Sequence, residues 1–193
     1  ALGGAVYSNA DVNITADNAT SLFAGNTANG KSNAIYMDSL KIENTVSDPD
    51  GEETTETVEY ADKPAVLTLS AVNKGKLIMN DAIDGVKYNL NISGDGTGEV
   101  ALNNSVTGVK ELSFGKNAVL HLGTKADIHT QNMKIEKNAT VTRNAVANPT
   151  LKIDVDVDRA NDKINSGMIN VAEDVSGSYS LIINALTPST LAN

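Results

Sequence analysis

Two nine-residue stretches of the chain follow one pattern: Leu112–Leu120 reads LSFGKNAVL, and Met133–Val141 reads MKIEKNATV. They align without a gap at an offset of 21 residues. Apolar residues match at the first, third and ninth places, and Lys-Asn-Ala matches in the middle. A weaker copy runs from Leu90 to Leu102 through a Gly-rich turn. Each copy therefore reads as a strand, a tight turn and a second strand.

The rest of the 193-residue chain also reads as short strands, because apolar and polar residues alternate between turn residues. The composition agrees, since 23 Asn and 15 Gly favour tight turns. No stretch keeps a helical period for three turns, so the predicted class is all-β. The clearest strands are Val12–Ile14, Ala34–Met37, Val66–Ala71, Tyr88–Ile92, Val100–Leu102, Val119–Leu122 and Leu151–Val157.

A strand unit of about 21 residues cannot bury its apolar face alone and has to stack on copies of itself. We therefore predict a parallel β-solenoid in which Leu112 lies beside Met133 in the adjoining layer. A narrow interior suits the low aromatic content of 4%. Asn117 and Asn138 are expected at the corners, where Asn tolerates left-handed backbone and its amide can join a ladder. An antiparallel β-sandwich stays as the alternative, although it does not predict the in-register match.

The charge is concentrated in one segment. The formal net charge is -9 and the sequence pI about 4.6, which disfavours nucleic acid as a partner. Seven carboxylates and no Lys or Arg lie between Thr45 and Asp62, and Pro64 follows. We predict a single domain over residues 1–193, with an acidic loop inserted at 45–64 and terminal coils at 159–193. The loop reads as a solvated excursion, or else as a cation-binding or partner-binding loop.

Several classes of site and segment are absent from the sequence. There is no Cys, which excludes disulfides and thiolate metal sites. No segment approaches the apolar length of a membrane-spanning helix. The first residues, Ala1–Gly4, lack the basic and apolar regions of a signal peptide, so an exported protein would carry its signal elsewhere or have lost it.

Gly3–Val6 reads GGAV, and Phe23–Asn26 reads FAGN. This pair resembles the repeat signature of chlamydial polymorphic membrane proteins and of related autotransporter passenger domains in Gram-negative bacteria. Asn161–Ile164 and Ser176–Leu181 are similar to the last passenger coils before the outer-membrane translocator. The resemblance implies a right-handed single-stranded parallel β-helix of the pectin-lyase-like type, secreted to the bacterial cell surface.

The resemblance also implies adhesion or display as the function, with a host surface protein or glycan as the partner. The chain itself would not insert into the membrane but would be tethered through a C-terminal translocator barrel. The motif residues have structural roles in this interpretation. Gly3 and Gly4 allow a backbone path that a Cβ would block, and Ala5 continues as a small inward residue. Phe23 would fill an interior layer, and Asn26 would close a turn through its amide.

Catalytic patterns are missing from the sequence. His121 and His129 lie in strand-like segments, and alternation points His121 away from the face of Leu120 and Leu122. Neither has the close-spaced companions of a zinc site, so both read as solvent-facing. There is no Gly-x-Ser-x-Gly elbow, and Gly94–Gly98 reads as a turn. We therefore predict no catalytic residue, no cofactor and no enzymatic activity.

One row of carboxylates leaves alternatives open. Asp154, Asp156 and Asp158 alternate with valines and would share one outward face of a strand. They read as a solvated face that discourages aggregation, with a calcium site or an acid/base pair of a polysaccharide-active enzyme as alternatives. The enzyme is disfavoured because the chain holds only two Arg, Arg143 and Arg159, and no Trp.

Overall fold

The computed structural model describes residues 3–39, 41–47, 49–51, 53–59, 63–136 and 149–186. These residues form strands joined by turns, and they contain no helix. Within this described part of the chain, no helical segment has the length and hydropathy needed to cross a membrane. The strands are β1 (Val6–Ser8), β2 (Val12–Asp17), β3 (Thr20–Phe23), β4 (Thr27–Ala28), β5 (Lys31–Ser32), β6 (Ile35–Met37), β7 (Lys41–Ser47), β8 (Glu53–Glu59), β9 (Val66–Val72), β10 (Lys76–Met79), β11 (Ile83–Gly85), β12 (Tyr88–Gly94), β13 (Glu99–Leu102), β14 (Ser105–Phe114), β15 (Val119–Leu122), β16 (Asp127–Ile135), β17 (Thr150–Asp158), β18 (Lys163–Ser166), β19 (Met168–Val171), β20 (Val175–Ser176) and β21 (Ser180–Ala185).

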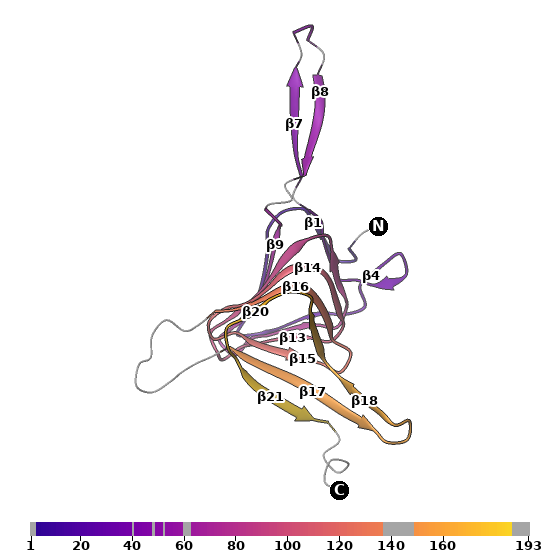
Figure 1. Ribbon diagram of the computed structural model, residues 1–193, viewed down its shortest axis with the longest axis vertical. Coiled ribbons are helices and arrows are strands. Elements are labelled where there is room, and N and C mark those ends of the chain that lie inside the picture. The colour runs from indigo at the N-terminus through magenta and orange to yellow at the C-terminus, as the bar shows by residue number, and fades with distance from the viewer. Residues whose placement is uncertain are drawn as a thin grey trace, which may run out of the picture.

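Two large sheets enclose a common core in a nearly closed, barrel-like arrangement (Figure 1). The ten-stranded sheet runs β1-β6-β11-β14-β12-β9-β2, with β16, β19 and β20 beyond β14. The seven-stranded sheet runs β18-β17-β15-β13-β10-β3, with β21 beside β17. The long strands β14 and β16 each pair with different strands along their two halves, so the larger sheet folds around the core.

Strand pairing in both large sheets is parallel, except between β17 and β18. Leu112 of β14 pairs with Met133 of β16, as the repeat predicts, and Leu90 of β12 pairs with Leu112 on its other side. The antiparallel sandwich is therefore wrong. Parallel order follows from the sequence repeat, because equivalent residues of consecutive units are brought to the same height of neighbouring strands.

The 21-residue spacing holds only in the middle of the chain. Leu112 and Met133 are 21 residues apart, but Val12 and its partner Leu67 are separated by 55 and Leu120 and Leu151 by 31. Two antiparallel hairpins, β4–β5 and β7–β8, lie between β2 and β9 and lengthen that connection. Insertions at turns preserve the pairing, since they change the path between strands and not the strands themselves.

The core consists of aliphatic ladders. In β9 and β12 every second residue is buried, and the buried positions of neighbouring strands pair with one another. Among the residues that the structure describes, two large rings, Tyr88 and Phe114, are completely buried. Leu120 and Leu122 of β15 are also inaccessible, so their neighbour His121 faces outward as alternation predicts.

Asparagine occupies left-handed turns. Asn117 has a φ of 59° between β14 and β15, which confirms its predicted corner conformation. Asn18, Asn29 and Asn73 adopt the same region. Asn is among the few residues with a Cβ that tolerate this backbone. Asn138 lies outside the described residues.

The acidic segment differs from its prediction. The segment does leave the body, as the predicted excursion over 45–64 would, but strands β7 and β8 form an antiparallel hairpin there that begins at Lys41 (Figure 1). Residues 41–47 and 53–59 include Ile42, Val46, Val58 and several Thr, which favour extended backbone. The many carboxylates of this segment favoured the prediction of a loop, and the strand propensity of its Ile, Val and Thr residues was overlooked.

Candidate functional site

A polar cluster lies on the outer face of the seven-stranded sheet, across β13, β15, β17 and β21. The buried residues Val100, Leu120 and Leu151 form one aliphatic row, and the more exposed Leu181 of β21 continues its register. Because side chains alternate along a strand, the residues next to this row face outward. Parallel register then places Ala101, His121, Lys152 and Ile182 side by side on the outer face.

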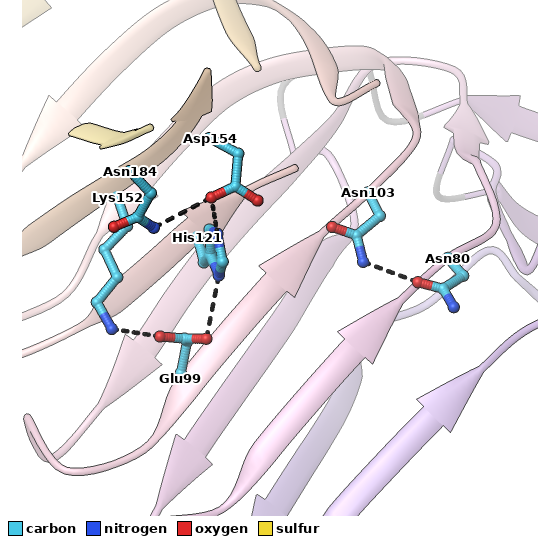
Figure 2. Close-up of polar contacts among 7 residues, drawn as sticks. All are labelled: Asn80, Glu99, Asn103, His121, Lys152, Asp154 and Asn184. Atoms are coloured by element: carbon cyan, nitrogen blue, oxygen red, sulfur yellow. Dashed lines mark hydrogen bonds and ion pairs between the residues drawn. The ribbon is translucent and has the colours of Figure 1, made fainter. Parts of the chain in front are cut away.

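His121 lies between two carboxylates (Figure 2). Its Nδ1 is 3.2 Å from Oε1 of Glu99, and its Nε2 is 2.8 Å from Oδ1 of Asp154. Lys152 Nζ binds the other oxygen of Glu99, Oε2. Asn184 Nδ2 donates to Asp154 Oδ1 at 3.1 Å. A neutral imidazole carries one N–H, so both contacts are hydrogen bonds only when His121 is protonated.

The cluster is partly shielded from solvent. The side chains of Glu99, Asp154 and His121 are 20%, 16% and 22% exposed. Burial raises the pKa of Glu99, but hydrogen bonds from Lys152 and His121 outweigh it and leave that pKa below its usual value. The geometry therefore fits a network of mutually bonded charged and polar side chains that joins four strands.

The network leaves little room for independent chemistry, since the carboxylates of Glu99 and Asp154 are both engaged by neighbouring side chains. Among the described residues, no group of three or more His, Asp or Glu side chains is arranged to hold a metal ion. In a second, separate pair, directly after the ends of β13 and β10, Nδ2 of Asn103 donates to Oδ1 of Asn80 at 2.7 Å (Figure 2).

The row of aspartates lies in β17, as the alternation predicts. Its members are divided among different partners rather than brought to one centre. Asp154 belongs to the polar cluster, and Asp156 pairs in register with Asn165 of β18. Asp158 accepts hydrogen bonds from Asn161, and the side-chain bond lowers the pKa of that carboxyl.

Both histidines face outward, as the alternation predicts, but each contacts carboxylates that the sequence did not indicate. His121 is held by Glu99 and Asp154, and the more exposed His129 contacts Oδ2 of Asp127 at 3.0 Å. The partners of His121 are 22 and 33 residues away in sequence. The alternation shows only that His121 faces outward, whereas its partners depend on the register between strands. Glu99 and Lys152 were not predicted as members of this cluster, because their contacts also depend on the register between strands.

The glycine-rich motif lies at the start of the fold. A Cβ on Gly4 would be 2.4 Å from the carbonyl oxygen of Asn33, so the backbone path requires glycine there, as predicted. Gly3 has a φ of +76°, which also favours glycine. Ala5 is exposed and not inward, because its neighbour Val6 is the residue that packs on the core.

The FxxN motif residues meet a buried aspartate. Phe23 is half-buried and packs against the core, consistent with its predicted interior role. Asn26 uses its amide, but its partner is Asp81 rather than its own turn. The backbone N and Nδ2 of Asn26 donate to Oδ2 of Asp81 at 2.7 and 2.8 Å.

Asp81 receives two further donors. Gly25 N and Ser32 Oγ donate to its Oδ1 at 3.1 and 3.2 Å. Burial acts to raise the pKa of Asp81, and the hydrogen bonds from Asn26, Gly25 and Ser32 together hold it below its usual value. The motif therefore ties the β3–β4 turn to the segment after β10, 55 residues later.

Comparison of the chain with family models, with curated proteins and with solved structures found no match. The residues and their geometry therefore carry the functional interpretation.

Proposed function

We propose that this chain is a non-catalytic, surface-exposed segment of an autotransporter passenger, which acts as an adhesin or rigid display stalk. In this proposal the two sheets are the faces of one right-handed single-stranded parallel β-helix. Its place is the outside of a Gram-negative cell, tethered through a C-terminal translocator barrel. A host surface protein or glycan is its partner.

The parallel aliphatic ladder is the observation that carries the proposal. Leu77, Val100, Leu120, Leu151 and Leu181 occupy paired positions on successive strands of one sheet. Such a stack is stabilised layer by layer, so it can extend without a larger central core. A stack of this kind supports protruding elements at a distance from its point of attachment.

The protruding element is the β7–β8 hairpin, which extends from the body (Figure 1). Exposed turns and hairpins on a rigid scaffold are common places for binding residues. The engaged side chains of the polar cluster also favour a structural role over catalysis, since each carboxylate of that cluster already has a partner.

Surface display tests the proposal. The chain is expressed between a secretion signal and an outer-membrane translocator barrel in a Gram-negative host. We expect antibody to label it on intact cells, trypsin to remove it slowly, and the cells to gain adhesion to a panel of host cells and glycans. Retention inside the cell, or rapid degradation at the surface, would contradict the passenger assignment. Display without adhesion would support the role of a display stalk and contradict the role of an adhesin.

A further inference from the structure

A groove of about 500 Å³ crosses four strands at the corner of the larger sheet. It is formed where β11 leads into β12, and by β14, β16 and β19. This volume is within the usual range for small-molecule sites. We call it the corner groove, and its polar lining consists of Lys87, Lys110, His129, Thr130, Gln131 and Asn170.

Glycine and a register shift create the hollow. Gly108 has a φ of +78°, and a Cβ there would be 1.9 Å from the carbonyl oxygen of Gly85. The backbones of two successive layers therefore approach closely, without side chains between them. Tyr88 pairs with Val109, but Asn89 pairs with Glu111, so Lys110 is an extra residue opposite β12. Bulges of this kind redirect side chains and are common beside functional sites.

Lys87 has an unusual backbone as well. Its φ is 52°, a left-handed conformation that is costly for a residue with a long side chain. An Asn or Gly would adopt this conformation more readily, yet the position carries a cation that lines the groove. The strained turn and the bulge thus bring Lys87 and Lys110 to the same depression from neighbouring layers.

The charge of the corner groove is opposite to that of the protein. The formal net charge is -9, but no Asp or Glu lines the groove. Within the described residues, neither Lys87 nor Lys110 forms an ion pair. Asp127, whose side chain is 42% exposed, is not among the lining residues, but its carboxylate contacts His129 Nε2 at 3.0 Å and accepts from Asn170 Nδ2 at 2.7 Å. It holds these two side chains in position.

The lining fits a saccharide better than a peptide. Strands β14 and β16, which cross the middle of the groove, are paired on both sides, so they offer no open edge for strand addition, the usual mode of extended peptides. β19 pairs only with β16 and keeps one open side at the rim. Recognition across β14 and β16 therefore depends on side chains. Val86 and Val171 provide apolar surface for the C–H face of a sugar ring. The amides of Gln131 and Asn170 can bind hydroxyls, and the two lysines can bind acid groups.

We propose that the corner groove binds an anionic oligosaccharide, with Lys87 and Lys110 paired to its carboxylate or sulfate groups. The inference gives a chemical class to the glycan partner named in the proposed function, but it stands on the groove alone, since it requires neither export nor attachment to a cell. Because the lysines are exposed or half-buried, binding weakens as salt is added.

Isothermal titration of the whole chain tests the groove with four probes: a hyaluronan oligosaccharide, a heparin oligosaccharide, a neutral cello-oligosaccharide and oligoglutamate. The test variant is Lys87→Gln with Lys110→Gln. Its matched control is Lys125→Gln with Lys134→Gln, which makes the same change in net charge at exposed positions outside the groove. Circular dichroism checks that both variants keep the β-sheet fold.

We expect saturable binding of one or both acidic saccharides, with affinity at least tenfold lower in the groove variant and unchanged in the control. Tighter binding of the hyaluronan or the heparin probe then identifies carboxylate or sulfate as the preferred group. An equal loss of affinity in both variants would show that binding depends only on the net charge of the protein, and it would overturn the proposal. Absence of binding to both acidic saccharides, or equal affinity for oligoglutamate or the neutral probe, would also overturn it.

Discussion

At the scale of single residues, a few buried polar side chains connect segments that are distant in sequence. Asp81 is only 7% exposed and accepts hydrogen bonds from Gly25, Asn26 and Ser32. The Glu99–His121–Asp154 row connects three strands in the same way. Both sites use charge-assisted bonds, which are stronger than neutral ones but costly when one partner is missing.

Asp81→Asn tests the first of these sites. The substitution preserves shape, but it places an NH2 group among N–H donors where a carboxylate oxygen accepts. We expect the free energy of unfolding to fall by about 1–3 kcal/mol, the usual cost of losing such bonds. Urea denaturation at pH 7 measures the change. Asp162→Asn removes the same charge at an exposed turn and should leave the free energy nearly unchanged, whereas equal effects would contradict the role of Asp81.

Glu99→Gln tests the polar cluster through pH. The pKa of Glu99 is lower in the folded protein than in the unfolded chain. An unperturbed Glu side chain has a pKa of about 4.3. The stabilising contribution of Glu99 is therefore complete above that value and is lost as pH falls through the folded pKa.

We expect Glu99→Gln to be less stable than the parent at pH 7, and this difference to shrink as the solution is acidified. Urea titrations at several pH values measure it. Glu136→Gln, at an exposed position on β16's C-terminal side, serves as control. A stability difference that stays constant with pH would show that the Glu99 charge contributes nothing.

At the scale of elements, alternation located β2, β6, β9, β12, β13, β15 and β17, and the repeat identified β12, β14 and β16 as neighbours. The predicted Leu112–Leu120 unit is seen as β14, a left-handed turn at Asn117 and β15. The β7–β8 hairpin was missed because its seven nearby carboxylates resemble a solvated loop. Strand propensity and charge are independent properties, and this segment combines residues that favour strands with a high negative charge.

Engineered disulfides test the parallel register. Asn91 and Ser113 are paired neighbours on β12 and β14, whereas Lys134 lies one strand further on β16. Adjacent strands are about 4.8 Å apart, and disulfides form when Cα atoms are separated by roughly 4.4–6.8 Å. We expect Asn91→Cys with Ser113→Cys to oxidise within the molecule, since the parent has no Cys to compete.

The control pair is Asn91→Cys with Lys134→Cys, two strand spacings apart at roughly 9.6 Å. Thiol titration after mild oxidation, with non-reducing mass spectrometry, distinguishes the two. Equal cross-linking of both pairs would contradict the strand order β12-β14-β16.

At the scale of the whole molecule, a stacked body carries a separate protruding hairpin (Figure 1). A two-stranded hairpin by itself is only marginally stable in water. The body instead draws its stability from the aliphatic ladders that both sheets share. The hairpin should therefore be dispensable for folding but not for contacts made far from the body.

We expect replacement of residues 41–59 by a short Gly-Ser linker to leave the thermal midpoint of the body nearly unchanged, because loop-closure entropy varies slowly with length. Differential scanning calorimetry measures the midpoint. Replacement of Thr27–Ser32 is the contrasting variant, since it removes the Ser32 bond to Asp81 and should lower the midpoint. A large loss of stability on removing 41–59 would contradict an independent hairpin.

The amino-acid sequence alone determined the all-β class, the parallel neighbourhood of Leu112 and Met133, and the left-handed turn at Asn117. These features follow from local backbone preference and from a repeat, and both can be recognised from the order of residues without knowledge of the fold. The sequence did not reveal the Glu99–His121–Asp154 contacts, the Asn26–Asp81 bond or the meeting of Lys87 with Lys110. Those contacts depend on insertions, bulges and register between layers, because a shift of one residue moves every side chain to the other face. Only the tertiary structure decides them.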